Sequence, residues 1–135
     1  MRRAGKFFAA AALCFAAALI LSAACAAGEA RYVKITAQEA KARMDAGRAA
    51  VLDVRTKEEY DEKHIPCALL IPYDMIEKGA PRLLPNKDEE ILIYCRSGRR
   101  SAIAAKKLAE MGYTRVFDFG GIIDWPYATE STPAL

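Results

Sequence analysis

The feature that most constrains this fold is the regular alternation of short apolar runs with helix-like segments. Apolar runs rich in branched and aromatic residues recur along the chain after residue 30 and predict strands. These strands are expected over 32–35, 49–54, 68–71, 91–94 and 116–119. Strands that alternate with helices at this spacing form parallel βαβ units with right-handed crossovers. We therefore predict one α/β domain with an open, five-stranded, mostly parallel sheet and helices on both faces.

Two capping boxes mark where helices begin. Thr36 with Glu39, and Thr56 with Glu59, place a hydroxyl before each helix and a carboxylate three residues later, a pairing that satisfies the first free amides of a helix. A longer helix is predicted over 101–111. The remaining expectations are a helical turn over 74–78, a Pro- and Gly-rich loop over 79–85, a short helix over 122–125 and a frayed tail from residue 126.

The positive charge of the chain is concentrated at its N-terminus. Arg2, Arg3 and Lys6 account for the whole formal charge of +3, because the chain after residue 27 carries 17 basic and 17 acidic side chains. They precede an uncharged apolar run over 7–27 that ends in small residues, which is the pattern of a secretory signal peptide. We therefore predict export across a bacterial inner membrane. The neutral remainder does not predict binding to nucleic acid or to a membrane surface.

Three outcomes are open for the signal region, residues 1–27. Cleavage after Ala26 or Ala27 would release a domain over 28–135 into the periplasm. Cys25 follows a sequence that resembles a lipoprotein signal, so lipidation there would tether the domain to the membrane. An uncleaved apolar run is about long enough to span a bilayer, although its alanines make it a weak span.

The candidate active site is the junction between the fourth strand and the helix after it. Cys95 leaves the strand, a short Gly-containing loop follows, and the helix begins at once. Inward-turned loop amides, the positive end of the helix and three arginines all favour the thiolate. We therefore predict that Cys95 is a catalytic nucleophile rather than a small buried core residue. The predicted substrate-binding residues are Arg96, Ser97, Gly98, Arg99, Arg100 and Ser101.

These segments together resemble the single-domain rhodaneses, which are thiosulfate sulfurtransferases. The resemblance covers about residues 32–126 and rests on three motifs that stand in the family's order. They are Leu52-Asp53-Val54-Arg55 with Glu59-Tyr60, His64-Ile65-Pro66 and Ala68; the active-site loop Cys95 through Arg100; and Gly112-Tyr113, Gly120-Gly121 and Trp125. With its predicted export, the chain is similar to periplasmic rhodaneses of the phage-shock type.

The resemblance implies a double-displacement reaction at Cys95. Sulfane sulfur would pass from thiosulfate to the cysteine, which becomes a persulfide as sulfite leaves, and cyanide or a thiol acceptor would then take the sulfur. The resemblance implies no metal and no organic cofactor. It also implies that Asp53 and Arg55 form structural polar bonds at the pocket floor. For His64, the only histidine, we expect a structural hydrogen bond rather than a part in a metal cluster or a catalytic triad.

Two positions depart from the family pattern. Lys63 and Cys67 stand where the family usually has glycine, so we expect a locally altered turn. Cys67 either fills its position as a small residue or approaches Cys95, as a resolving thiol or as a disulfide partner in an oxidising compartment.

Two other functions remain open on the sequence. A persulfide carrier that works with partner proteins would use the same Cys95. A cysteine phosphatase would place arginine six residues after the cysteine, where this chain has Ser101, in a loop one residue longer. A thioredoxin-like enzyme is disfavoured because there is no CxxC motif. The expected partners are small anionic sulfur donors and thiol or cyanide acceptors, with a membrane contacted only through the N-terminal segment, and the domain is expected to be a monomer.

Overall fold

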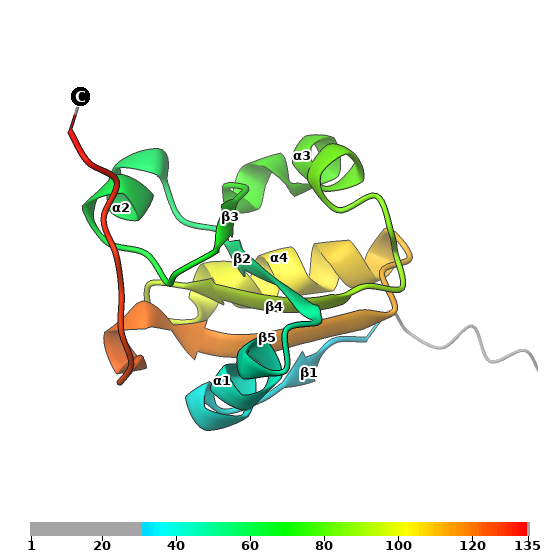
Figure 1. The fold of residues 1–135 in the computed structure, drawn as a ribbon. Helices are drawn as coiled ribbons and strands as arrows, with labels where there is room; N and C mark the ends of the chain where they lie inside the picture. The colour runs from blue at the N-terminus through cyan, green and yellow to red at the C-terminus, as the bar shows by residue number, and fades with distance from the viewer. Residues whose placement is uncertain (1–30, 135) are drawn as a thin grey trace, which may run out of the picture.

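A computed structural model describes residues 31–134 as one sheet with helices packed against it (Figure 1). The sheet has the strand order β1-β5-β4-β2-β3, and every pairing between these strands is parallel. This confirms the predicted α/β fold, in which the sheet is wholly rather than mostly parallel. The strands are β1 (Val33–Lys34), β2 (Ala49–Asp53), β3 (Leu69–Leu70), β4 (Glu90–Cys95) and β5 (Arg115–Gly121).

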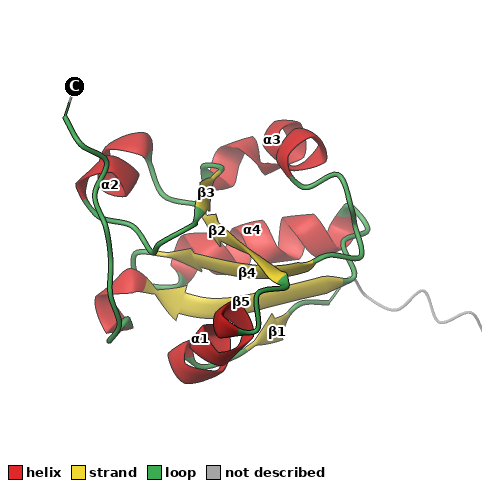
Figure 2. Cartoon of the chain, in the orientation of Figure 1, coloured by secondary structure: helices red, strands yellow, loops and turns green. Residues whose placement is uncertain are grey.

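Helices cover both faces of the sheet, as Figure 2 shows. Helices α3 and α4 pack together, and α4 lies on β4 and β5, while α1 contacts β2 and β5 from the opposite side. Both predicted capping boxes are present, at Thr36 and at Thr56. The helices are α1 (Ala37–Asp45), α2 (Lys57–Glu62), α3 (Ile76–Leu83) and α4 (Arg99–Glu110), with 3₁₀ turns at Tyr73–Met75 and Ile122–Asp124.

The expected signal region, residues 1–27, and the lipidation candidate Cys25 lie outside the described residues, so export and lipidation stay predictions. Within residues 31–134, no helix is both long enough and apolar enough to cross a membrane.

The central strand β4 divides the core into two halves. All six of its residues are buried, and they alternate between the halves because successive side chains of a strand point to opposite faces. Ile91, Ile93 and Cys95 join the half beneath α3 and α4, whereas Leu92 and Tyr94 join the half beneath α1. The sheet therefore directs the Cys95 side chain toward the α4 side.

The prediction of a loop over 79–85 is wrong, because most of this segment belongs to helix α3. This helix continues to Leu83 and contains Pro81. Ile76 and Ala80 lie one helical turn apart and are both fully buried. Burial of this face outweighs the local preferences of glycine and proline, which are weak guides once tertiary packing acts.

The prediction of a frayed tail is also wrong, because the chain after Pro126 is bound to the domain. The main chains of His64 and Glu130 exchange two hydrogen bonds of 2.8 Å as an antiparallel bridge, and the Thr132 amide donates to the carbonyl oxygen of Asp61 at 2.9 Å. Tyr127 is half-buried against the core. Main-chain hydrogen bonds such as these can form between residues of almost any type, so no sequence pattern predicts them.

Cys67 shows the altered turn that its sequence position predicts. Its φ of +65° lies in the left-handed region, which favours glycine because a Cβ atom is crowded there. Both Cys67 and Cys95 are free thiols. Cys67 is exposed and lines a groove of about 510 Å³ beside α1, whereas Cys95 joins the core on the α4 side. The two cysteines are therefore not paired in this structure.

Replacing Cys67 by glycine should stabilise the protein by about 1 kcal/mol, because glycine adopts this φ without steric cost. Urea unfolding under reducing conditions measures the change. Cys67→Ala is the matched control, since it removes the thiol and keeps the Cβ atom. An equal gain in the alanine variant would show that the thiol, not the backbone, is the source of strain.

Candidate active site

The candidate nucleophile stands at the carboxyl end of the central strand. Cys95 ends β4, three loop positions follow, and α4 begins at Arg99. Gly98 precedes the helix with a φ of +105°, which allows the sharp turn. A Cβ atom at Gly121 of β5 would overlap the Arg96 carbonyl group. The glycines of the loop and of β5 therefore let two backbone segments meet closely around the sulfur.

Backbone donors surround the Cys95 sulfur. The amide of Gly98 donates to Sγ at 3.0 Å. Burial raises the pKa of this thiol, but hydrogen bonds outweigh burial and lower the pKa overall. The donors responsible are the amide and hydroxyl of Ser101 and the amides of Gly98 and Ser97. The site therefore favours the thiolate, which is the nucleophilic form of cysteine.

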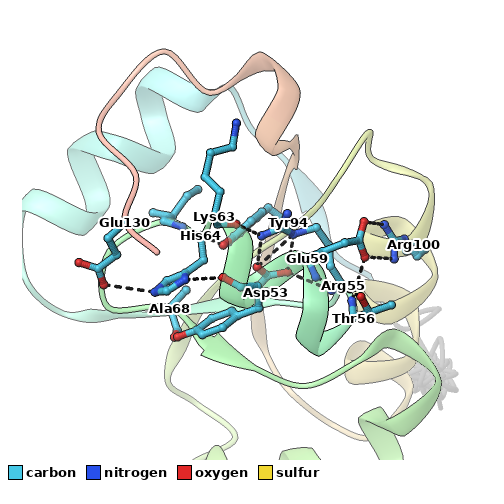
Figure 3. A network of polar contacts seen from close by, with 12 residues as sticks. Asp53, Arg55, Thr56, Glu59, Lys63, His64, Ala68, Tyr94, Arg100 and Glu130 are labelled. Atoms are coloured by element: carbon cyan, nitrogen blue, oxygen red, sulfur yellow. Dashed lines mark hydrogen bonds and ion pairs between the residues drawn. The ribbon is translucent and has the colours of Figure 1, made fainter. Parts of the chain in front are cut away.

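The three arginines of the loop differ in their surroundings. Arg100 gives both of its terminal nitrogens to the Glu59 carboxylate, at 2.8 Å each (Figure 3). Arg96 and Arg99 are exposed, and neither makes an ion pair with any residue in 31–134. Two of the predicted substrate-binding arginines are thus free to meet an anion, and the third is bound within the protein.

Glu59 has two structural tasks that the capping-box pattern alone did not reveal. Its carboxylate accepts the Thr56 amide at 2.9 Å at the start of α2, and the same group holds Arg100 of α4. The Arg100 hydrogen bonds, opposed by burial and aided by the Thr56 amide, lower the pKa of Glu59 to about 2. This carboxylate therefore joins α2 to the first turn of the helix that carries the active-site loop.

Asp53 and Arg55 form a buried pair at the carboxyl end of β2. The Arg55 guanidinium donates to both carboxylate oxygens of Asp53, at distances from 2.7 to 3.1 Å, and to the carbonyl oxygen of Lys63 at 2.6 Å. Burial lowers the pKa of Arg55, but its bonds to Asp53 outweigh burial and raise the pKa. All of these partners are internal, which agrees with the structural part proposed for the pair.

His64 binds the C-terminal segment rather than the Cys95 loop. Its ring is stacked on Tyr60 with centroids 3.8 Å apart, and Nδ1 lies 2.7 Å from the Tyr60 carbonyl oxygen. Nε2 lies 3.3 Å from the Glu130 carboxylate (Figure 3). These contacts fit a structural part for the only histidine.

Ser101 and Asp118 form a second buried polar pair, beneath the loop. Ser101 is fully buried in the first turn of α4, and Asp118 of β5 is 3% exposed. The Ser101 hydroxyl lies 2.8 Å from Asp118 Oδ1, which also accepts the Gly120 amide at 3.0 Å. Sequence reasoning missed Asp118. The signal that could have found it is a single acid inside an otherwise apolar strand.

Within residues 31–134, no group of three or more His, Cys, Asp and Glu side chains is placed to hold a metal ion.

The profile of the rhodanese-like domain matches residues 36–126. The chain therefore belongs to the rhodanese-like domain family, and the site described above lies within the matched residues. The solved structure of a rhodanese with anions from Escherichia coli is 32% identical, with a TM-score of 0.59 over 62% of this chain and 98% of that one. A rhodanese-related protein from Thermoplasma volcanium is 27% identical, with a TM-score of 0.65 over 73% and 98% of the two chains.

Curated relatives carry two kinds of name. The thiosulfate sulfurtransferase PspE of Escherichia coli is 37% identical over 54% of this chain and 70% of its own length. YrkF of Bacillus subtilis, named as a candidate sulfur carrier protein, is 43% identical over 59% of this chain. The match spans only 43% of the length of YrkF. The chain is thus similar to one relative named as a sulfurtransferase and to another named for sulfur carriage.

Replacing Glu59 by glutamine should cost about 1–2 kcal/mol of unfolding free energy at neutral pH, because it weakens charge-assisted hydrogen bonds. A carboxyl whose pKa is lowered in the folded protein stabilises it above its ordinary pKa of 4.5 and loses that effect as pH falls toward 2. The gap between wild type and E59Q should therefore be constant above pH 5 and close between about pH 4.5 and 2.

Denaturant unfolding across this pH range measures the gap. Glu58→Gln is the matched control, because Glu58 is the exposed neighbour and makes no ion pair within residues 31–134. A gap for E59Q that stays unchanged down to pH 2 would contradict the assignment.

Proposed function

We propose that the protein is a thiosulfate sulfurtransferase that works through a persulfide on Cys95. The thiolate attacks the terminal sulfur of thiosulfate, a bond forms between the two sulfur atoms, and sulfite leaves with the electron pair of the broken S–S bond. Cyanide or a thiolate then attacks the outer sulfur of the persulfide, and the Cys95 thiolate leaves. The observation that carries this proposal is the convergence of backbone donors on a cysteine whose pKa is lowered.

The site suits this reaction because each species in it is an anion. Fixed amide donors stabilise negative charge on sulfur without reorganising during the reaction. Both steps move electron pairs between sulfur atoms, so the proposed mechanism needs no histidine, metal or organic cofactor. His64, which is bound to Tyr60 and Glu130, is accordingly given no chemical task.

Burial of the cysteine favours a small donor. Cys95 is 1% exposed, so a donor must place one sulfur atom inside the loop, as the terminal sulfur of thiosulfate can. A persulfide would carry the reactive sulfur about 2 Å further from the Cys95 Sγ atom. This supports a reaction in which a small anion loads the site and a wider range of acceptors unloads it.

A persulfide carrier remains the second candidate, because the relatives include one named for sulfur carriage. The carrier would use the same loop and the same cysteine, and would differ in holding its sulfur until a partner protein arrives. A cysteine phosphatase is less well supported, because Ser101 occupies the position of its arginine and donates to Asp118.

The purified protein should convert thiosulfate and cyanide to thiocyanate, and Cys95→Ser should abolish this, because serine cannot form a persulfide. Colorimetric thiocyanate detection measures turnover, and intact mass shows a gain of one sulfur atom, about 32 Da, on the thiosulfate-treated protein. Cys67→Ser is the matched control and should keep its activity. A stable sulfur adduct with slow turnover would favour the carrier, and the absence of both would overturn the sulfurtransferase proposal.

Replacing Arg96 and Arg99 together by glutamine should raise the KM for thiosulfate about 3- to 10-fold and leave kcat nearly unchanged, because exposed charges attract an anion without touching the sulfur. Initial rates at low and high salt measure the effect, which should shrink as salt screens the charges. Arg48→Gln, at the opposite end of the sheet before β2, is the control. A fall in kcat at constant KM would contradict this part for the two arginines.

A further inference from the structure

The proposed reaction leaves the buried Ser101–Asp118 pair without a task, although the pair adjoins the sulfur. The Ser101 amide and hydroxyl help to lower the pKa of Cys95, and Ser101 contacts Gly98, whose amide donates to the sulfur at 3.0 Å. The same hydroxyl lies 2.8 Å from Asp118 Oδ1, 3.1 Å from the Gly98 carbonyl oxygen and 3.4 Å from the Gly120 carbonyl oxygen. Three oxygen acceptors therefore contact one hydroxyl close to the sulfur.

A serine hydroxyl has one hydrogen, so it can donate fully to only one acceptor at a time. Among the acceptors with a measured contact, the Asp118 oxygen is the nearest, and a carboxylate is a stronger acceptor than a carbonyl. Asp118 is therefore the preferred acceptor of this hydrogen, and the Cys95 sulfur shares it less often. Cys95 can receive it only when the hydroxyl rotates away from Asp118.

Asp118 is well placed to keep accepting the hydrogen bond of the Ser101 hydroxyl. It is almost fully buried, and the Gly120 amide fixes the same carboxylate oxygen at 3.0 Å. The other charged groups near Cys95 are Arg100 of α4 and, through it, Glu59 of α2 and Asp53 of β2. None of these groups shares a hydrogen bond with Ser101 or Asp118 within residues 31–134.

We propose that Asp118 is a positioning residue that competes with the Cys95 sulfur for the Ser101 hydroxyl hydrogen. This proposal rests on the sulfurtransferase function, because only that reaction uses the Cys95 sulfur in two opposite ways. The competition would adjust the reactivity of the sulfur between those two uses. Cys95 must be a good nucleophile when it takes sulfur and a good leaving group when it gives sulfur up. A sulfur that receives one more hydrogen bond leaves faster but attacks more slowly.

Replacing Asp118 by asparagine should therefore release the Ser101 hydrogen to the sulfur. We expect the pKa of Cys95 in D118N to fall by about one unit. Above both pKa values, sulfur uptake from thiosulfate should slow about threefold and sulfur release to cyanide should quicken about threefold, following the usual dependence of thiolate reactivity on basicity. A merely structural part for Asp118 would not move these two half-reactions in opposite directions.

The pKa of Cys95 is measured from the pH dependence of iodoacetamide labelling, followed by mass spectrometry of tryptic peptides. Cleavage after Lys87 and Arg96 isolates Cys95 from every other cysteine of the chain. Asp124→Asn is the matched control, because Asp124 is an exposed acid just after β5, and it should leave the labelling profile unchanged. This readout does not use thiosulfate, so the inference about Asp118 and the sulfurtransferase proposal can fail separately.

Removing the Ser101 hydroxyl tests the competition directly. Ser101→Ala should change the pKa of Cys95 much less in the wild-type background than in D118N, where it should reverse most of the fall. An equal rise in both backgrounds would overturn the proposal, because the hydroxyl would then serve the sulfur regardless of Asp118. If D118N fails to fold, the S101A variant alone tests the proposal. A rise of one unit or more in the pKa of Cys95 in S101A would show that the Ser101 hydrogen already lies on the sulfur, and this would overturn the proposal.

Discussion

The structure depends on the meeting of a buried strand end and a helix start at one sulfur atom. The Gly98 amide reaches Cys95 Sγ at 3.0 Å only because β4 ends there and α4 begins after three loop residues. Placing β4 at the centre of a parallel sheet fixes the position of Cys95, and the packing of α4 on β4 and β5 fixes the direction of the amides. The chemistry of the thiol is therefore a property of the sheet and helix together.

Charge around this sulfur is arranged in two layers. Fixed donors and the internally bound Arg100 lie close to Cys95, whereas Arg96 and Arg99 face solvent. In the proposed function, the inner layer would stabilise an anion that has arrived, and the outer layer would attract it from a distance. This division explains how three arginines in five residues can serve one cysteine without crowding it.

The sequence predicted the elements with local signatures and failed where long-range contacts decide. The two capping boxes predict α1 and α2, and the apolar run that ends in Cys95 predicts β4 and the candidate nucleophile. Helix α3 was predicted only as a turn over 74–78, because its continuation depends on burying Ile76 and Ala80, which outweighs local glycine and proline. The Arg100–Glu59 and Ser101–Asp118 pairs join residues far apart in the chain, and nothing in a single sequence pairs them.

The close approach of Gly121 to the Arg96 carbonyl group limits the size of the Cys95 loop. One wall of this loop is formed by strand β5, so the width of the loop is set partly by residues outside it. Inserting a residue into the loop would not simply widen it, because β5 blocks expansion on that side. We therefore expect a longer loop at this position to require a compensating change in β5, so that two separate segments would have to change together.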